Sequence, residues 1–292
     1  MNVYTWDDIE NGKFLSKDEL MAKGYHGTAV TVGAFDGVHR GHRALFDAVL
    51  SQHEMSGVVT FRFPPKVKTM AESFAGSLST LDQRLECFKA LGMDFVLVID
   101  FSGDFGRMRG DTFLQLLTDR LHMVYLAEGA DFRCGYKGAV GIREIKEFAY
   151  SHGIVFQEVP SVMEGETKVS SSEIRKALLA GDTKKAATLL GYDYTLDGSC
   201  FSWTFCSDRI RGSQESELSG YKQLLPQSGN YTGKVRFLYN GQESCIDALL
   251  SVGEKTVDIL CKDVSSVFAM GVDSPGRQVI RTVEFTVSYR LS

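Results

Sequence analysis

Two histidines, His39 and His42, lie three residues apart in the segment TVGAFDGVHRGHRALFDAVL (31–50). The segment predicts a strand that ends at Gly33, a turn, and an amphipathic helix that begins with the histidines. A helix N-terminus binds phosphate through its free N–H groups and dipole, and Gly41 allows close backbone approach. Both imidazoles share one helix face and can hydrogen-bond a phosphoryl oxygen as its charge grows in the transition state. These residues predict nucleotidyl transfer.

Two other interpretations of the histidine pair stay open at this point. So short a motif recurs by chance, and the residues could be surface histidines beside a turn. Zinc would need a third ligand at a suitable spacing, and neither that ligand nor an H-E-x-x-H arrangement is visible in the sequence. The order of strand, glycine-rich turn and helix favours the phosphate interpretation.

A second candidate is the segment VSSSEIR (169–175). Ser170 and Glu173 form the pattern of a capping box, which alone could explain the serines structurally. Hydroxyl groups at a helix N-terminus, followed one turn later by Arg175, also suit a nucleoside triphosphate and its leaving pyrophosphate. The histidine pair makes the phosphate interpretation the favoured one.

A third candidate is the segment GADFRCG (129–135), at the end of a predicted strand. It could be a glycine-flanked turn whose Phe132 packs on the core. Ligands of open α/β sheets bind at the carboxyl ends of the strands. The position therefore predicts that Asp131 and Phe132 face a ligand.

The elements that must position these residues follow from alternating apolar runs and helical patterns between Thr28 and about Gly191. A capping box at Thr80 and Gln83 and a terminal Gly92 mark one of the helices. Apolar strands joined by helices predict a doubly wound, Rossmann-like α/β domain with a parallel sheet, and Leu45, Phe46 and Val49 of the first segment should face its core. The predicted strands are 28–33, 57–61, 94–100, 123–127 and 154–159.

After Tyr192 the pattern changes to short alternating segments with glycine- and serine-rich turns. This predicts a small antiparallel β-barrel or sandwich, with a polar loop from Cys206 to Gln227. We therefore expect a nucleotidyltransferase domain over residues 1–190 and a β domain over 191–292. The predicted strands are 234–240, 244–252, 255–260 and 278–289.

Composition limits the partners of the chain. The 292 residues carry a net charge of −5 without a basic run, which disfavours nucleic acid. The sequence shows no apolar run of about 18 residues and no export signal at its start, so we expect neither a membrane protein nor an exported one. Six cysteines without metal-ligand spacing predict reduced thiols in the cytoplasm, and no obligate protein partner is evident.

The three motifs in order, with VLVIDFSGDFGRM (96–108) between them, strongly resemble the bacterial bifunctional riboflavin kinase/FMN adenylyltransferase family, the prokaryotic FAD synthetases. The resemblance covers about residues 12–198. It implies an ATP-binding flavoprotein transferase of FAD biosynthesis that converts ATP and FMN to FAD and pyrophosphate with Mg²⁺, through metal ligands that the sequence does not identify. The implied catalytic residues are His39, His42 and Arg175. The implied ATP-binding residues are Gly33, Phe35, Asp36, Gly41, Ser170, Ser171 and Ser172, and the implied flavin-binding residues are Phe61, Asp131, Phe132, Arg133 and Gly135.

The chain also departs from that family. Thr60 to Pro65 read TFRFPP where the family usually has T-F-x-P-H-P, and Cys134 replaces the second Phe of D-F-x-F-G. The β domain lacks the kinase signature G-R-x-x-G-F-P-T-A-N, so we expect no riboflavin phosphorylation. The alternatives are a nucleotidyltransferase for another phosphorylated acceptor and a flavin-binding protein without catalysis.

Overall fold

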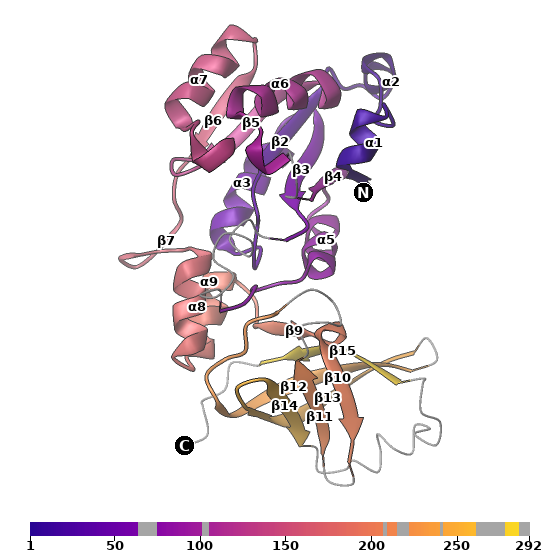
Figure 1. The fold of residues 1–292 in the computed structure, drawn as a ribbon, viewed down its shortest axis with the longest axis vertical. Helices are drawn as coiled ribbons and strands as arrows, with labels where there is room; N and C mark the ends of the chain where they lie inside the picture. The colour runs from indigo at the N-terminus through magenta and orange to yellow at the C-terminus, as the bar shows by residue number, and fades with distance from the viewer. Residues whose placement is uncertain are drawn as a thin grey trace. The chain divides into compact units, whose positions relative to one another are not determined.

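The computed structural model of the chain describes residues 1–63, 75–100, 105–206, 209–214, 222–239, 242–260 and 278–285. The chain divides into two compact units, which are described separately (Figure 1). The first consists of Met1–Ser73 and Arg84–Lys168, and the second of Phe74–Gln83 and Val169–Ser292. Several residues of the motifs and predicted strands lie outside the described ranges: Pro64 and Pro65, residues 101–104, and residues 240 and 286–289 of two predicted strands, as does Cys261, one of the six cysteines.

A six-stranded sheet forms the centre of the first unit, and all of its strand pairs are parallel. Its order is β1-β4-β3-β2-β5-β6, so the direction of winding reverses between β2 and β5. A ligand crevice of a doubly wound sheet lies at such a reversal. The strands are β1 (Asn2–Thr5), β2 (Thr28–Val32), β3 (Met55–Phe61), β4 (Phe95–Ile99), β5 (Met123–Gly129) and β6 (Val155–Val159).

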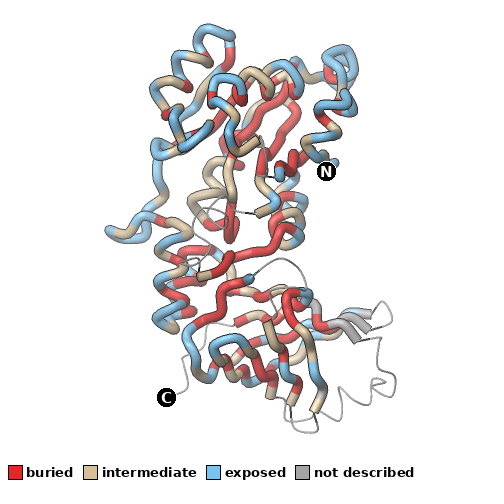
Figure 2. Tube along the Cα trace, viewed as in Figure 1, coloured by how far each residue is buried: buried red, intermediate tan, exposed pale blue. Residues whose placement is uncertain are grey.

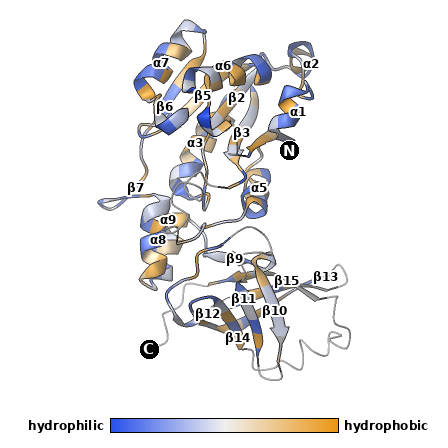
Figure 3. Cartoon of the chain, viewed as in Figure 1, coloured by the Kyte–Doolittle hydropathy of each residue, from blue (hydrophilic) through white to orange (hydrophobic). Residues whose placement is uncertain are grey.

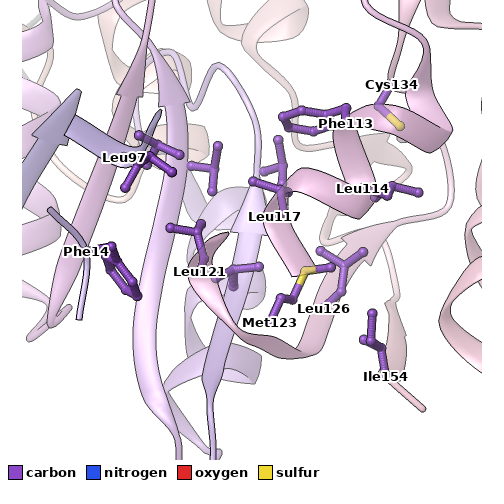
Figure 4. Packing of buried hydrophobic residues seen from close by; sticks show 14 of the residues in the cluster. Phe14, Leu97, Phe113, Leu114, Leu117, Leu121, Met123, Leu126, Cys134 and Ile154 are labelled. Atoms are coloured by element: carbon purple, nitrogen blue, oxygen red, sulfur yellow. The ribbon is translucent and has the colours of Figure 1, made fainter. Parts of the chain in front are cut away.

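Helices cover both faces of this sheet, which confirms the predicted α/β class. The first unit contains α1 (Trp6–Glu10), α2 (Lys17–Ala22), α3 (Arg40–Leu50), most of α5 (Leu81–Ala90), η1 (Phe105–Arg107), α6 (Gly110–Leu121), η2 (Tyr136–Gly138), α7 (Ile142–Ser151) and a hairpin of β7 (Met163–Glu164) and β8 (Thr167–Lys168). Helices α1, α2, α6 and α7 share one hydrophobic cluster with the sheet, in which Leu114 and Leu117 pack near Leu97 and Leu126 (Figure 4). On α6 and α7, hydrophobic residues alternate with hydrophilic ones, as helices with one buried face require (Figure 3).

Helices α3 and α5 pack on the other face. Phe46 of α3 and Phe88 of α5 are fully buried, with ring centroids 5.4 Å apart. Val49 is also fully buried, as predicted, whereas Leu45 is only partly buried. Gly92 follows the end of α5 at φ +88°, the left-handed conformation that favours glycine.

The described part of the second unit combines helices α8 and α9 and the first residues of α5 with a curled antiparallel sheet of order β10-β11-β14-β13-β12-β15-β9. Its elements are α8 (Ser171–Leu179), α9 (Thr183–Leu190), β9 (Thr195–Asp197), η3 (Gly198–Cys200), β10 (Phe201–Phe205), β11 (Ile210–Gln214), β12 (Gly229–Tyr239), β13 (Gln242–Val252), β14 (Thr256–Leu260) and β15 (Gln278–Glu284). The predicted capping box of α5 lies in this unit: the Thr80 N–H donates to Gln83 Oε1 at 3.0 Å, and the Gln83 N–H donates to Thr80 Oγ1 at 3.2 Å.

The predicted loop from Cys206 to Gln227 is wrong where the chain forms β11. Ile210 is fully buried, and Arg211 donates to both carboxylate oxygens of Asp258 on the neighbouring β14, at 2.7 and 2.6 Å. The cross-strand ion pair allows a polar segment to be a strand. Residues 207–208 and 215–221 of the same stretch lie outside the described ranges.

The inner strands β4, β3, β2 and β5 of the parallel sheet are almost entirely buried, whereas the edge strands β1 and β6 and the outer faces of helices such as α7 are mostly exposed (Figure 2). In the described part of the chain, no helix is long and apolar enough to cross a membrane. The five cysteines that the structure describes are free thiols: Cys87, Cys134, Cys200, Cys206 and Cys245.

Candidate active site

The turn between β2 and α3 holds an unusual backbone. Phe35 and Val38 have φ angles of +48° and +38°, which bulky residues seldom adopt, and Gly37 lies at +84°. A Cβ on Gly33 would lie 2.9 Å from the Phe35 ring, so glycine there is a packing requirement. Phe35 and Asp36 are both buried. The turn is thus a compact, strained support for the helix that follows it.

The two histidines stack directly on one another at the start of α3. Their ring centroids are 3.5 Å apart and their planes differ by 17°. His39 is the N-cap residue, and its Nδ1 accepts the backbone N–H of His42 at 3.3 Å. The Phe35 ring meets the His42 ring edge-on, with centroids 5.2 Å apart. Nδ1 of His39 must be unprotonated to accept this bond, which leaves a proton on Nε2 of the neutral ring.

His42 is held in the neutral state. Burial, followed by the neighbouring His39 and the Arg84 guanidinium, holds the pKa of His42 well below its usual value of 6.5. Among the described residues, His42 Nδ1 is buried without a hydrogen-bond partner. A neutral imidazole offers one donor and one acceptor, so the stacked pair can donate hydrogen bonds to a phosphoryl oxygen near neutral pH.

An apolar cavity of about 480 Å³ opens at the carboxyl edge of the same sheet. This volume is within the range of small-molecule sites. Phe61 and Phe132 line it, together with Arg133 and Gly135, so four of the five predicted flavin residues contribute to its wall. Among the described residues, the cavity is lined by Val32, Phe61, Phe105, Gly106, Met108, Phe113, Phe132, Arg133, Cys134, Gly135, Tyr136, Lys137 and Gly138.

Asp131, the fifth predicted flavin residue, is not part of this wall. Its carboxylate accepts a hydrogen bond from Lys168 Nζ at 2.8 Å, and this ion pair lowers the pKa of Asp131. Its side chain is 76% exposed. The structure therefore places it on the surface beside the β7–β8 hairpin.

Sequence reasoning did not single out several residues of the wall. Phe105 and Met108 belong to the segment VLVIDFSGDFGRM, which contributes to the family resemblance. The sequence predicts no role for any single residue of that segment. Tyr136 lies just after the GADFRCG turn, and Phe113 comes from the buried face of α6. The clustering of aromatic residues after β4 was the one available signal for this wall.

Glu128 is a further buried group at this edge. Its carboxylate accepts the Val32 N–H at 2.6 Å, between the strands where the winding reverses. Burial raises the pKa of Glu128 well above its usual value of 4.5, against the lowering effects of the Val32 N–H and the Thr31 hydroxyl.

The serine-rich motif lies in the second unit. Ser170 is the N-cap of α8, and its hydroxyl accepts the Glu173 N–H at 3.3 Å. The predicted capping box is only half formed, because the Glu173 carboxylate accepts a bond from Lys176 at 2.6 Å. Ser171 and Ser172 form the first turn of the helix, and the Arg175 Nε donates to the Gly76 carbonyl at 3.1 Å. The role of these residues in ATP binding stays a prediction.

No group of three or more His, Cys, Asp or Glu side chains among the described residues could hold a metal ion. Mg²⁺ usually takes only one or two carboxylates and completes its shell with water and substrate phosphates. The described residues thus offer no preformed set of metal ligands.

Comparisons with known proteins show the family of the chain. The sequence profile of the family described as FAD synthetase matches residues 22–173, more than half of the chain. The chain is 28% identical over 214 residues to the bifunctional riboflavin kinase/FMN adenylyltransferase of Escherichia coli K12, covering 72% of this chain and 68% of that protein. It is 26% identical over 257 residues to the protein of the same name from Listeria monocytogenes, covering 82% and 74%.

A solved structure shows the same fold. The crystal structure described as a macrolide-efflux protein from Streptococcus pneumoniae superposes with a TM-score of 0.76 at 20% identity, over 100% of this chain and 92% of that one. This likeness concerns the fold alone. The profile match over residues 22–173 carries the assignment: the chain belongs to the FAD synthetase family.

Proposed function

We propose that this protein is an FMN adenylyltransferase that transfers the AMP moiety of ATP to FMN, giving FAD and pyrophosphate. The observation that carries the proposal is the stacked pair of His39 and a neutral His42, together with an aromatic cavity of about 480 Å³ at the same sheet edge. The histidine pair suits a phosphate, and the cavity suits a flat apolar ring. The relatives named as FMN adenylyltransferases support the same activity.

In the proposed reaction an oxygen of the FMN phosphate attacks the α-phosphorus of ATP in line. The bond from this phosphorus to the oxygen bridging to the β-phosphate breaks, and pyrophosphate leaves. No covalent enzyme intermediate forms. His39 and His42 donate hydrogen bonds to the α-phosphate as its charge grows, and the dipole of α3 adds to this stabilisation. Positioning and charge stabilisation supply most of the catalysis in such reactions.

The roles of the remaining residues complete the proposal. Phe61, Phe132, Arg133 and Gly135 hold the flavin ring in the cavity. Phe35 and Asp36 shape the turn that presents α3, while Ser170, Ser171 and Arg175 hold the triphosphate. Mg²⁺, for which the described residues form no ligand cluster, would accompany ATP and help to neutralise the charge of its phosphates. The substrates are the only obligate partners, and the free thiols fit a cytoplasmic protein.

We further propose that residues 1–190 carry this activity and that the β domain, 191–292, does not phosphorylate riboflavin. The support is the sequence after residue 190, which has no Pro-Thr pair where the family's kinase signature supplies ATP and metal residues.

The test offers ATP with either FMN or riboflavin to the full-length protein and separates the products by chromatography. The proposal predicts FAD from FMN and no FMN from riboflavin. Turnover of a different phosphate ester without FAD would favour another acceptor. FMN binding without pyrophosphate release would favour a non-catalytic flavin-binding protein.

A further inference from the structure

Arg84, in the first turn of α5, is a buried cation that the proposed mechanism does not use. Only 1% of the residue is exposed. Its Nη1 donates to the Ala34 carbonyl and to Thr60 Oγ1, both at 2.8 Å. Its Nη2 donates to the carbonyls of Phe61 and Arg62, at 2.9 and 3.0 Å. One guanidinium thus serves four acceptors in two separate segments.

These two segments carry the two halves of the candidate site. Ala34 begins the turn that leads to His39 and His42, and Phe61 ends β3 and lines the apolar cavity. Carbonyl groups at the ends of strands need a hydrogen-bond partner when they are buried. Arg84 supplies one partner to both segments and so links the phosphate turn to the cavity wall.

We infer that Arg84 is a positioning residue for adenylyl transfer: it fixes the turn that carries the histidines against the end of β3 that carries Phe61. The inference rests on the proposed function. With its donors directed to protein carbonyls and the Thr60 hydroxyl, Arg84 acts through the groups that it holds. Reacting groups displaced by about 1 Å can lose about 10²-fold in rate, so this link matters for the chemistry as well as for the fold.

The charge of Arg84 supports the same inference. An arginine stays protonated at any physiological pH, and this fixed cation is one of the three causes that lower the pKa of His42, after burial and His39. The groups that face His42 are therefore His39, Arg84 and the uncharged Phe35 ring. Loss of the cation should raise the pKa of His42 toward its usual value.

Two substitutions separate the geometry of Arg84 from its charge. Arg84→Lys keeps the cation but cannot reproduce the planar fork that serves four acceptors. Arg84→Met removes both the fork and the charge. Arg120→Lys, at an exposed position on α6, is the matched control.

The experiment measures kcat and KM for FMN, FMN binding by quenching of flavin fluorescence, and the pH titration of the His42 ring by NMR, on the full-length protein. We expect Arg84→Lys to lower kcat/KM about 10²-fold and to weaken FMN binding, with His42 still neutral at pH 6.5. Arg84→Met should shift the His42 titration upward. Arg120→Lys should match the wild type in its kinetic constants, its FMN binding and its His42 titration.

Wild-type kinetics, FMN binding and His42 titration in Arg84→Lys would overturn the inference. If Arg84→Met fails to fold, Arg84→Lys and the titration of the wild type still decide: a wild-type His42 that titrates near pH 6.5 contradicts the arrangement. If the wild type makes no FAD, the proposed function fails separately. FMN binding and the His42 titration then test the positioning role of Arg84 without a measurement of FAD formation.

Discussion

Gln223 of the second unit and His42 of the first unit differ in how their buried polar atoms are paired. In the second unit Gln223 is completely buried, yet its amide donates to the carbonyls of Leu78 and Thr195, at 3.0 and 2.9 Å, and accepts the Asp197 N–H at 2.8 Å. In the first unit His42 Nδ1 has no hydrogen-bond partner among the described residues. A satisfied polar network specifies a structure, whereas a desolvated, unsatisfied group at a sheet edge marks a site for a ligand.

The difference assigns different consequences to the two substitutions. Removing the His42 ring should reduce catalysis more than stability. Removing the Gln223 amide should reduce stability more than catalysis.

The largest expected effect is that of His42→Ala. Loss of one preorganised donor to the reacting phosphate should lower kcat for FAD formation about 10²- to 10³-fold, with the fold intact by circular dichroism. His53→Ala, at an exposed histidine, is the matched control. Activity near that of the wild type in His42→Ala would reject this site.

In the second unit, Gln223→Leu should lower the free energy of unfolding by about 3 kcal/mol, since buried groups left without partners cost about 1–3 kcal/mol each. The rate of FAD formation per folded molecule should stay within about twofold of the wild type, because the histidine pair and the cavity belong to the first unit. Denaturant unfolding and the chromatographic assay measure the two quantities. Asn230→Leu, an exposed amide on β12, controls for the added side chain. Unchanged stability, or a lost rate in folded protein, would contradict the contrast.

The cavity predicts an intermediate effect. Phe132→Ala removes an aromatic wall, and aromatic ring contacts are worth about 0.5–1.5 kcal/mol beyond the area that they bury. We expect KM for FMN to rise about tenfold while KM for ATP stays constant. Tyr150→Ala, at an aromatic residue that is 91% exposed, should leave both constants unchanged. Equal increases in KM for FMN and in KM for ATP would show that the cavity is not specific to the flavin.

The smallest expected effect is on the pH dependence of stability. Because the folded pKa of Glu128 lies well above 4.5, the folded state binds the proton more tightly than the unfolded chain. The stabilisation that the Glu128 proton gives the folded state is complete below pH 4.5 and is lost as the pH rises through the folded pKa. Glu128→Gln cannot titrate, so subtracting its urea midpoints from those of the wild type isolates the effect. Exposed Glu166→Gln is the control. A wild type that gains stability relative to Glu128→Gln as the pH rises would contradict the assignment.

Four of the five predicted strands of the first unit, those that form β2, β3, β4 and β5, were found because buried parallel strands are continuous apolar runs. The fifth, β6, was found although its residues, VFQEV, are mostly exposed. Strand β1 was missed, since its four residues, NVYT, are mostly exposed and form a strand through their pairing with β4. Strand β11 was missed for a similar reason, because the bond from Arg211 to Asp258 depends on a strand far along the chain.

In the candidate site, too, some residues could be predicted from the sequence and others could not. The spacing of His39 and His42 within one helix start was enough to predict their pairing. Arg84 was not predicted, because its acceptors lie 22 to 50 residues earlier in the sequence. Local patterns therefore identified the groups placed at the phosphate, and tertiary contacts supplied the groups that hold them.

The most direct test of the central claim follows the label from ATP labelled at the α-phosphate, with FMN as acceptor. The proposed reaction predicts that the label enters FAD, that unlabelled pyrophosphate forms in equal amount, and that His42→Ala slows the formation of both about 10²- to 10³-fold. Label that remains in ATP, or that enters a product other than FAD, would contradict the account.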